Sequence, residues 1–133
     1  MRVFLDTNVL ASAFATRGLC ADVLRHVLAD HELLVGEVVL QELRRTFKKK
    51  FRLPAELVDD IERMLRDHEV VPRPDRPSLV TLRDPDDQWI VASAVAGRAD
   101  LLVTGDRDLL DAADKLPLAV LDPRGFWELL RRK

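Results

Sequence analysis

Cysteine and histidine are scarce in this 133-residue chain, which has one cysteine and three histidines. Because Cys20 has no second cysteine to pair with inside the chain, the sequence predicts a protein of the reducing cytoplasm. Structural zinc sites are built from clustered cysteines and histidines. His26, His31 and His68 do not form such a set with Cys20, so no zinc site is expected.

Long apolar runs are also missing. No segment approaches the roughly 18–20 residues that a transmembrane helix needs. Asp6 and Asn8 interrupt the apolar start of the chain too early for a secretory signal peptide. The glycine-rich phosphate loop and the G-x-S-x-G turn of serine hydrolases are absent. The length is typical of one domain, so residues 1–133 are expected to form a single domain.

Neither sign of charge dominates, since 21 Lys and Arg face 23 Asp and Glu for a formal net charge of −2. Nucleic-acid-binding domains are often strongly basic, so this total by itself argues against such a partner. The charges are nevertheless segregated along the chain. Residues 44–52 contain six basic residues and no acid, whereas residues 84–122 contain nine Asp and three basic residues. The small total therefore conceals two opposed blocks.

Short apolar segments alternate with segments of helical periodicity along the sequence. This alternation predicts an α/β fold, with a central parallel sheet of about four to five strands covered on both faces. Ligand sites in such sheets lie at the carboxyl ends of the strands, near the point where the strand order reverses. The predicted strands are residues 3–5, 33–35, 69–71, 101–104 and 118–121, and the predicted helices are approximately residues 9–14, 19–30, 38–47, 54–66, 85–97, 107–114 and 124–132.

Two aspartates follow predicted strands. Asp6 ends the first strand in FLDTNVL, and Asp106 follows the strand LLVT through Gly105 in LLVTGDRDLL. Each could be the N-cap of the next helix, with Asp108 as a favourable acid in the first turn. Each also stands where a ligand site of a parallel sheet is expected. The residues alone leave both interpretations open.

Two further acids lie on predicted helices, close to apolar faces. Asp84 and Pro85 suit the start of a helix, and Asp87 heads the apolar stripe of that helix. Because burying a lone carboxylate is unfavourable, this position favours a functional role for Asp87. Glu42 borders the buried face of its own helix. It is either a site residue or the partner of Arg45 in an i,i+3 ion pair.

Carboxylates that converge from distant segments repel one another and need cations. Hard carboxylate oxygens favour Mg²⁺ or Mn²⁺, and such a centre suits hydrolysis of phosphodiesters. The basic block at 44–52 would then hold a polyanion, although basic residues also suit the end of a helix. The candidate catalytic residues and metal ligands are Asp6, Glu42, Asp87 and Asp106.

In these motifs the sequence resembles the PIN-domain ribonucleases, and more specifically the small VapC-like toxins of toxin–antitoxin pairs. The resemblance spans nearly the whole chain and keeps the order of the motifs. FLDTNVL resembles the opening motif, VVLQELRRTF the helical glutamate motif, DQWIVASA the third motif and LVTGDRDLL the fourth. It implies metal ligands at Asp6, Glu42, Asp87 and Asp106, and supporting residues at Asn8, Thr104, Asp84 and Asp108.

The resemblance implies a three-layer α/β/α PIN-like fold and an endoribonuclease that depends on Mg²⁺ or Mn²⁺. Hydroxide generated at the metal would attack the phosphodiester in line and leave a 5′-phosphate and a 3′-hydroxyl. Such toxins are commonly homodimers held inactive by a cognate antitoxin, whose C-terminal segment occupies the acidic groove. The family does not specify the basic residues that hold the RNA, and in this chain they are expected to be Arg44, Lys48 and Lys49.

Two other functions compete with this one. Haloacid-dehalogenase-like phosphatases also begin with an acid after the first strand. They usually place a second aspartate two residues later, where this chain has Asn8, and Leu110 stands where their late motif needs an aspartate. The other competitor is a non-catalytic nucleic-acid-binding or dimerisation module. The presence of all four motif acids argues against it, and RNA cleavage is the observation that separates these functions.

Overall fold

The computed structural model describes residues 1–132. Its elements confirm the predicted alternation, with small shifts at their ends, except that the helix expected over 107–114 divides into α6 and a 3₁₀ turn. The strands are β1 (Arg2–Leu5), β2 (Glu32–Gly36), β3 (Glu69–Val71), β4 (Leu101–Val103) and β5 (Ala119–Leu121). The helices are α1 (Thr7–Ala15), α2 (Leu19–Asp30), α3 (Glu37–Lys49), α4 (Ala55–Arg66), α5 (Pro85–Ala96), α6 (Arg107–Asp111), the 3₁₀ turn η1 (Ala113–Lys115) and α7 (Pro123–Arg131).

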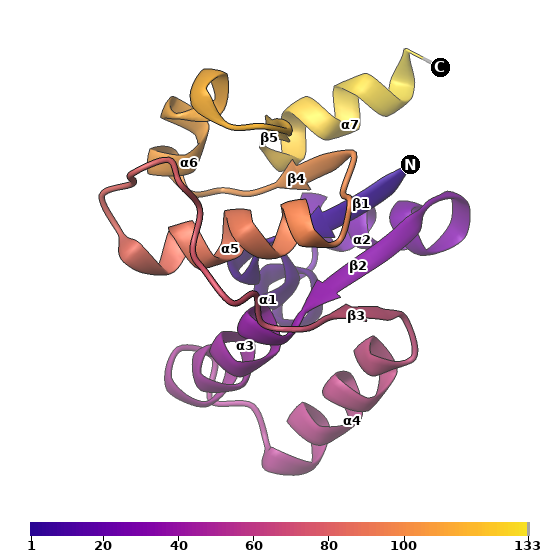
Figure 1. The fold of residues 1–133 in the computed structure, drawn as a ribbon. Helices are drawn as coiled ribbons and strands as arrows, with labels where there is room; N and C mark the ends of the chain where they lie inside the picture. Colours follow the sequence, from indigo (N-terminus) through magenta and orange to yellow (C-terminus); the bar gives the residue numbers. More distant parts are fainter. Residues whose placement is uncertain (133) are drawn as a thin grey trace.

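The five strands form one parallel sheet in the order β3-β2-β1-β4-β5 (Figure 1). β1 lies in the middle, where Val3 stands opposite Leu33 of β2 and Leu101 of β4. From β1 the chain continues outward through β2 and β3, and it then crosses back to β4 and β5 on the other side. The strand order therefore reverses between β1 and β4, which is the expected place for a ligand site.

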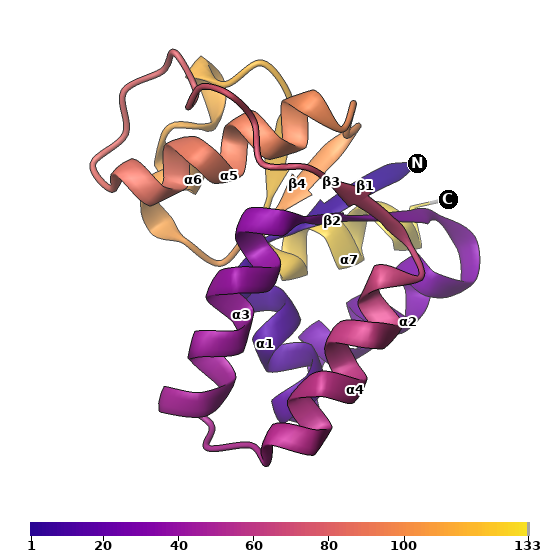
Figure 2. The same cartoon turned by 60° about the horizontal axis from the view of Figure 1, so that its bottom comes forward.

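Helices cover both faces of the sheet, which confirms the predicted three-layer α/β/α fold. α5 packs against β2, β3 and β4 on one face, and α6 lies on the same side (Figure 2). α1, α2 and α7 lie on the other face, where α2 contacts both of its neighbours. α3 and α4 form an antiparallel pair that projects away from the sheet (Figure 2).

One apolar core runs through the strands and the inner faces of the helices. Phe4, Leu34 and Leu102 come from three neighbouring strands and have no exposed surface. Full burial of one such side chain typically stabilises the fold by about 1.5–3 kcal/mol. This packing holds the strand ends, and hence the residues that follow them, in fixed positions. No helix within residues 1–132 combines the length and apolarity needed to cross a membrane.

β2 continues into α3 without a loop because Gly36 is both the last residue of the strand and the N-cap of the helix. A Cβ atom at Gly36 would lie 2.9 Å from Cζ of Phe4, closer than carbon atoms normally approach. Glycine therefore permits the direct turn from strand to helix. As a result, α3 starts at the carboxyl edge of the sheet and brings Glu42 to the cavity described below.

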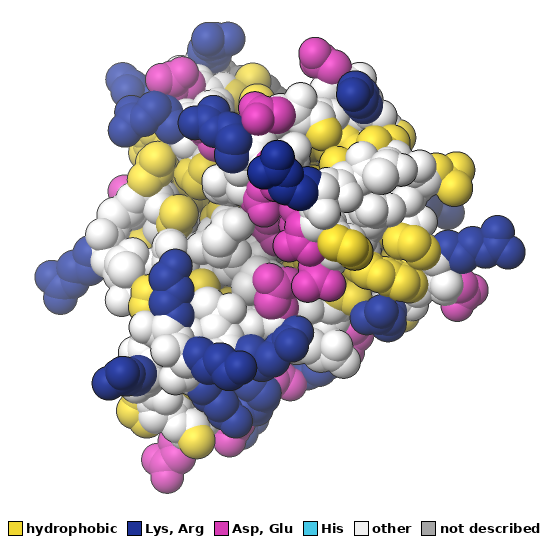
Figure 3. All heavy atoms as spheres, turned by 90° about the vertical axis from the view of Figure 1, so that its left-hand side faces the viewer, with side chains coloured by type: hydrophobic (Ala, Val, Ile, Leu, Met, Phe, Trp, Pro, Cys, Tyr) yellow, Lys and Arg dark blue, Asp and Glu magenta, His cyan; other side chains and the backbone are white. Residues whose placement is uncertain are grey.

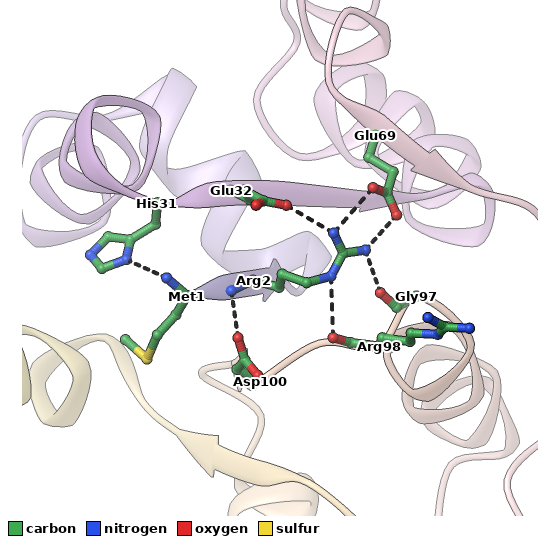
Figure 4. Close-up of polar contacts among 8 residues, drawn as sticks. All are labelled: Met1, Arg2, His31, Glu32, Glu69, Gly97, Arg98 and Asp100. Carbon is green, nitrogen blue, oxygen red and sulfur yellow. Dashed lines mark hydrogen bonds and ion pairs between the residues drawn. The ribbon is translucent and has the colours of Figure 1, made fainter.

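Arg2 joins the strands at the opposite, amino-terminal edge of the sheet (Figure 4). Its guanidinium donates to the carboxylates of Glu32 and Glu69, and to the carbonyl of Gly97 at 2.7 Å. Its backbone N–H donates to Asp100 at 2.8 Å. The hydrogen bond from Arg2 is the main reason that the pKa of Glu69 lies below its ordinary value. These paired charges therefore lie at the opposite end of the strands from the candidate ligands Asp6 and Asp106.

Candidate metal centre

The carboxyl ends of β1 and β4 place the residues that follow them side by side. The backbone N–H of Asp6 donates to the carbonyl of Val103 at 3.0 Å, which extends the pairing of the two strands. Asp6 is the N-cap of α1, and Thr104 leads from β4 towards α6. Asp6 is 4% exposed and Thr104 is 0% exposed. The point of strand reversal therefore carries a buried carboxylate beside a buried hydroxyl.

Asp6 caps α1 with one carboxylate oxygen and contacts β4 with the other. Its Oδ1 accepts from the backbone N–H of Thr7 at 2.7 Å, and its Oδ2 accepts from Oγ1 of Thr104 at 2.7 Å. Burial raises the pKa of Asp6, and the charge of Asp106 adds to this effect, whereas the two hydrogen bonds oppose it. The carboxylate is thus held in one orientation with its charge incompletely compensated.

Thr104 and Asn8 connect the turn after β4 to the start of α1. Oγ1 of Thr104 accepts from the backbone N–H of Asp106 at 3.0 Å while it donates to Asp6. Oδ1 of Asn8 accepts from the backbone N–H of Gly105 at 3.0 Å. These bonds fix the direction in which the chain leaves β4, and so they fix the position of Asp106.

Asp106 and Asp108 lie close to Asp87 of α5. Asp106 is the N-cap of α6, since its Oδ1 accepts from the backbone N–H of Asp108 at 2.8 Å. Oxygens from the three carboxylates lie within 4.8 Å of one another. Three like charges at this separation are unfavourable unless a proton or a cation is shared among them.

Asp87 combines burial with an unpaired carboxylate oxygen. It stands in the first turn of α5 and is 7% exposed, and within residues 1–132 its Oδ2 has no hydrogen-bond partner. Burial, followed by the charges of Asp106, Asp6 and Asp84, raises the pKa of Asp87 to about 7. Buried polar groups are nearly always hydrogen-bonded, and buried charges are paired or bind metals. This carboxylate has room for a ligand that the protein itself does not supply.

Glu42 approaches these acids from α3 and is half-buried. Burial is the main reason that its pKa lies above the ordinary value, and the charges of Asp6 and Asp86 add to the effect. The positive charge of Arg45, the possible i,i+3 partner, opposes this rise in pKa only weakly. The electrostatic surroundings of Glu42 are therefore dominated by the other acids.

The acids line one cavity of about 260 Å³. All four candidate ligands lie in its wall, together with Asn8 and Asp84. Figure 3 shows acidic side chains gathered in the middle of this face, with a dense group of Lys and Arg below them. Of the supporting residues, Thr104 is buried and donates to Asp6, and a carboxylate oxygen of Asp108 lies within 4.8 Å of oxygens of Asp87 and Asp106.

Sequence patterns did not single out the side chains that the end of α3 adds to this cavity. Thr46, Lys50 and Phe51 line it together with Glu42. Glu42, Thr46 and Lys50 recur every four residues, which places them on one face of a helix. That spacing was the available signal for Thr46 and Lys50. Phe51 lies beyond the end of α3, so helical spacing does not indicate it.

The three basic residues expected to bind RNA do not line the cavity. Arg44 forms ion pairs with Asp59 and Glu62 of α4, the second at 3.2 Å. Lys48 and Lys49 are exposed near the end of α3. An RNA contact by Arg44 would therefore require it to leave two carboxylates, whereas the two lysines are open to solvent.

The donor set fits a hard divalent cation. Acidic residues from four separate segments line one cavity, and one buried oxygen of Asp87 has no hydrogen-bond partner in the part of the chain that the structure describes. Magnesium and similar ions prefer such oxygen ligands and keep several waters. The described residues of the wall include no cysteine or histidine, the groups that softer metals favour.

A sequence profile of the PIN domain matches residues 2–108. The chain therefore belongs to the PIN domain family, a family of nucleases that use divalent metals. A comparison with curated protein sequences found no match. Membership of this family sets the phosphatase alternative aside. The structure is consistent with this exclusion. Asn8 stands where the phosphatases have their second aspartate, and its Oδ1 accepts a hydrogen bond from the backbone N–H of Gly105.

Solved structures share the fold at low sequence identity. The structure of VapBC2 from Rickettsia felis, bound to a DNA fragment from the VapBC2 promoter, contains a chain that matches with a TM-score of 0.62 and 18% identity. The match covers 92% of this chain and 98% of the VapBC2 chain. FitAcB from Neisseria gonorrhoeae matches with a TM-score of 0.58 and 19% identity over 92% and 98% of the two chains. FitAB bound to an IR36 DNA fragment matches with a TM-score of 0.58 and 18% identity over 91% and 94%.

Proposed function

We propose that this protein is an endoribonuclease dependent on Mg²⁺ or Mn²⁺, and that it is the VapC-like toxin of a toxin–antitoxin pair. The observation that carries the proposal is the convergence of four carboxylates on one cavity, in which a buried oxygen of Asp87 has no partner among the described residues. Membership of a nuclease family supports phosphodiester hydrolysis. The basic surface beside the acids supports a polyanionic substrate (Figure 3).

The chain's own residues would hold the ion from three sides. Asp6 and Asp106 approach from the carboxyl ends of β1 and β4, Asp87 from α5, and Glu42 from α3, directly or through water. A bound divalent ion supplies hydroxide from water at neutral pH and stabilises charge on the leaving oxygen. Hydrolysis that breaks the bond between phosphorus and the 3′ oxygen would leave a 5′-phosphate and a 3′-hydroxyl.

Other residues would keep these ligands in position. Thr104 orients the carboxylate of Asp6, and Asn8 holds the turn that carries Asp106. Asp84, in the cavity wall, is a secondary ligand candidate. Lys48 and Lys49 remain the candidates for contacts to the RNA backbone, because they are exposed near the end of α3, whereas Arg44 is engaged in ion pairs.

RNA cleavage in the presence of Mg²⁺ or Mn²⁺ tests the nuclease. We expect wild type to cleave only with the ion, and Asp6→Asn and Asp87→Asn to be inactive. Asp111→Asn is the matched control, because Asp111 is an exposed acid on α6 outside the cavity wall. Cleavage that survives both site substitutions would overturn the site, and RNA binding without any cleavage would favour the non-catalytic module.

A partner protein is part of the same proposal. The similar structures VapBC2 and FitAB are toxin–antitoxin complexes, which supports a cognate antitoxin for this chain. Induction of wild type in bacteria should stop growth, and co-expression of the neighbouring gene's product should restore it, whereas Asp87→Asn should be harmless in both cases. Growth that is indifferent to wild type would contradict the toxin role. Light scattering of the purified protein measures the expected homodimer.

A further inference from the structure

We propose that Lys50 and Phe51 form a nucleotide-binding site at the edge of the acidic cavity. This site selects single-stranded RNA. This inference rests on the proposed nuclease function. Both residues line the cavity, although neither belongs to the acidic motifs. Lys50 would contact a backbone phosphate, and the ring of Phe51 would stack on an unpaired base.

The turn that ends α3 positions this pair. The backbone N–H of Lys50 donates to the carbonyl of Thr46 at 2.9 Å, and the N–H of Leu53 donates to the carbonyl of Phe47 at 3.0 Å. Between them Arg52 adopts a φ of +52°, in the left-handed region that few non-glycine residues enter. The chain therefore folds back on the helix end, and Phe51 stays beside the cavity.

Lys50 and Phe51 present a cation and an aromatic surface together. The Nζ atom of Lys50 lies 5.7 Å from the centroid of the Phe51 ring. Lys50 is exposed, while Phe51 is half-buried, because part of its ring packs against the core. Within residues 1–132, Lys50 is the only cationic and Phe51 the only aromatic side chain in the cavity wall.

A nucleotide carries the complementary pair of groups, a phosphate and a base. The carboxylates of the cavity repel a phosphate, so a cation in the same wall lowers the barrier to its approach. Stacking on an aromatic side chain is tolerant of base identity, but it requires a base that has left its own stack. Single-stranded segments meet this condition, whereas paired A-form helices do not.

Binding measurements on a non-cleaving protein test the inference. In the full chain with Asp87→Asn, fluorescence anisotropy compares a short single-stranded RNA with a blunt-ended RNA duplex of the same composition. We expect Phe51→Leu to weaken single-strand binding roughly 5- to 50-fold, and Phe51→Trp to retain it. Lys50→Ala should reduce the slope of log K against log salt by about 0.7. The control Arg131→Ala changes an exposed residue on α7 and should leave both RNAs unaffected.

RNA that lacks one base tests the stacking without a change in the protein, so the result does not depend on whether a variant folds correctly. Removal of the stacked base should weaken binding to the parent protein and abolish the difference between the parent and Phe51→Leu. Equal loss of duplex and single-strand binding in Phe51→Leu would overturn single-strand selection. If wild type cleaves RNA but Phe51→Leu and Lys50→Ala bind it like the parent, this inference is wrong and the proposed function stands. If wild type neither binds nor cleaves RNA, the proposed function fails with it.

Discussion

The hydroxyl of Thr104 at the end of β4 donates a 2.7 Å hydrogen bond to the carboxylate of Asp6 at the end of β1, 98 positions away in the sequence. The same oxygen accepts from the backbone N–H of Asp106 at 3.0 Å. One buried hydroxyl therefore orients the carboxylate of Asp6 and holds the backbone of Asp106. Because such hydrogen bonds set the direction of a ligand's lone pairs, they affect metal binding without touching the metal.

Replacement of Thr104 by Val should weaken Mn²⁺ binding about 10- to 100-fold, because the substitution keeps the shape and removes the hydroxyl. Calorimetric titration of the purified protein measures this affinity. Thr104→Ser, which retains the hydroxyl, is the matched variant and should stay close to wild type. Equal affinities for Thr104→Val and wild type would show that the hydrogen bond to Asp6 has no influence on the site.

Asp87→Asn should raise the melting temperature of the metal-free protein at neutral pH while abolishing cleavage. The substitution removes one of the mutually repelling charges in a cluster where burial already disfavours ionisation. A gain of about 1 kcal/mol corresponds to a rise of roughly 3–6 °C for a domain of this size. Thermal unfolding in EDTA measures it, with Asp111→Asn as the exposed control. A lower melting temperature for Asp87→Asn would contradict this account of the cluster.

The stabilising effect of Asp87→Asn should depend on pH. The pKa of Asp87 is raised from 3.8 to about 7 in the folded protein, so the folded state holds this proton more tightly than the unfolded chain does. The corresponding stability is fully present below the unfolded pKa and is lost as the pH rises through about 7. The difference in melting temperature between Asp87→Asn and wild type should therefore grow from about pH 4 to about pH 8. A difference that is constant across this range would count against the raised pKa.

Addition of Mg²⁺ or Mn²⁺ should stabilise wild type at neutral pH, because the ion binds the folded acids and offsets their repulsion. Binding at a concentration of 100 times Kd adds about 2.7 kcal/mol. Differential scanning fluorimetry with and without EDTA measures the shift. Asp6→Asn and Asp87→Asn should lose most of it, whereas Asp111→Asn should keep it. A shift of the same size in all four proteins would place the ion elsewhere on the surface.

Local sequence patterns were sufficient to predict the strands and helices and several of the side chains that line the cavity. The position of Asp87 at the head of an apolar stripe predicts burial, and the structure confirms that it is 7% exposed. The strand ends predict that Asp6 and Asp106 meet, and both line the cavity. Helical periodicity does not reveal that Arg44 turns to Asp59 and Glu62, because those partners belong to another helix.

The sequence by itself determined the succession of strands and helices along the chain and the residues that follow each strand, because these depend on patterns of a few neighbouring residues. Its near-neutral total charge did not reveal the separate acidic and basic blocks, since a sum does not record where charges lie. Only the tertiary structure decided that Asp87 Oδ2 has no hydrogen-bond partner within residues 1–132 and that Lys50 and Phe51 line the same cavity as the acids. These features depend on how α3, α5 and the ends of β1 and β4 pack together. Contacts of that kind join residues far apart in the chain, and no local pattern encodes their distances.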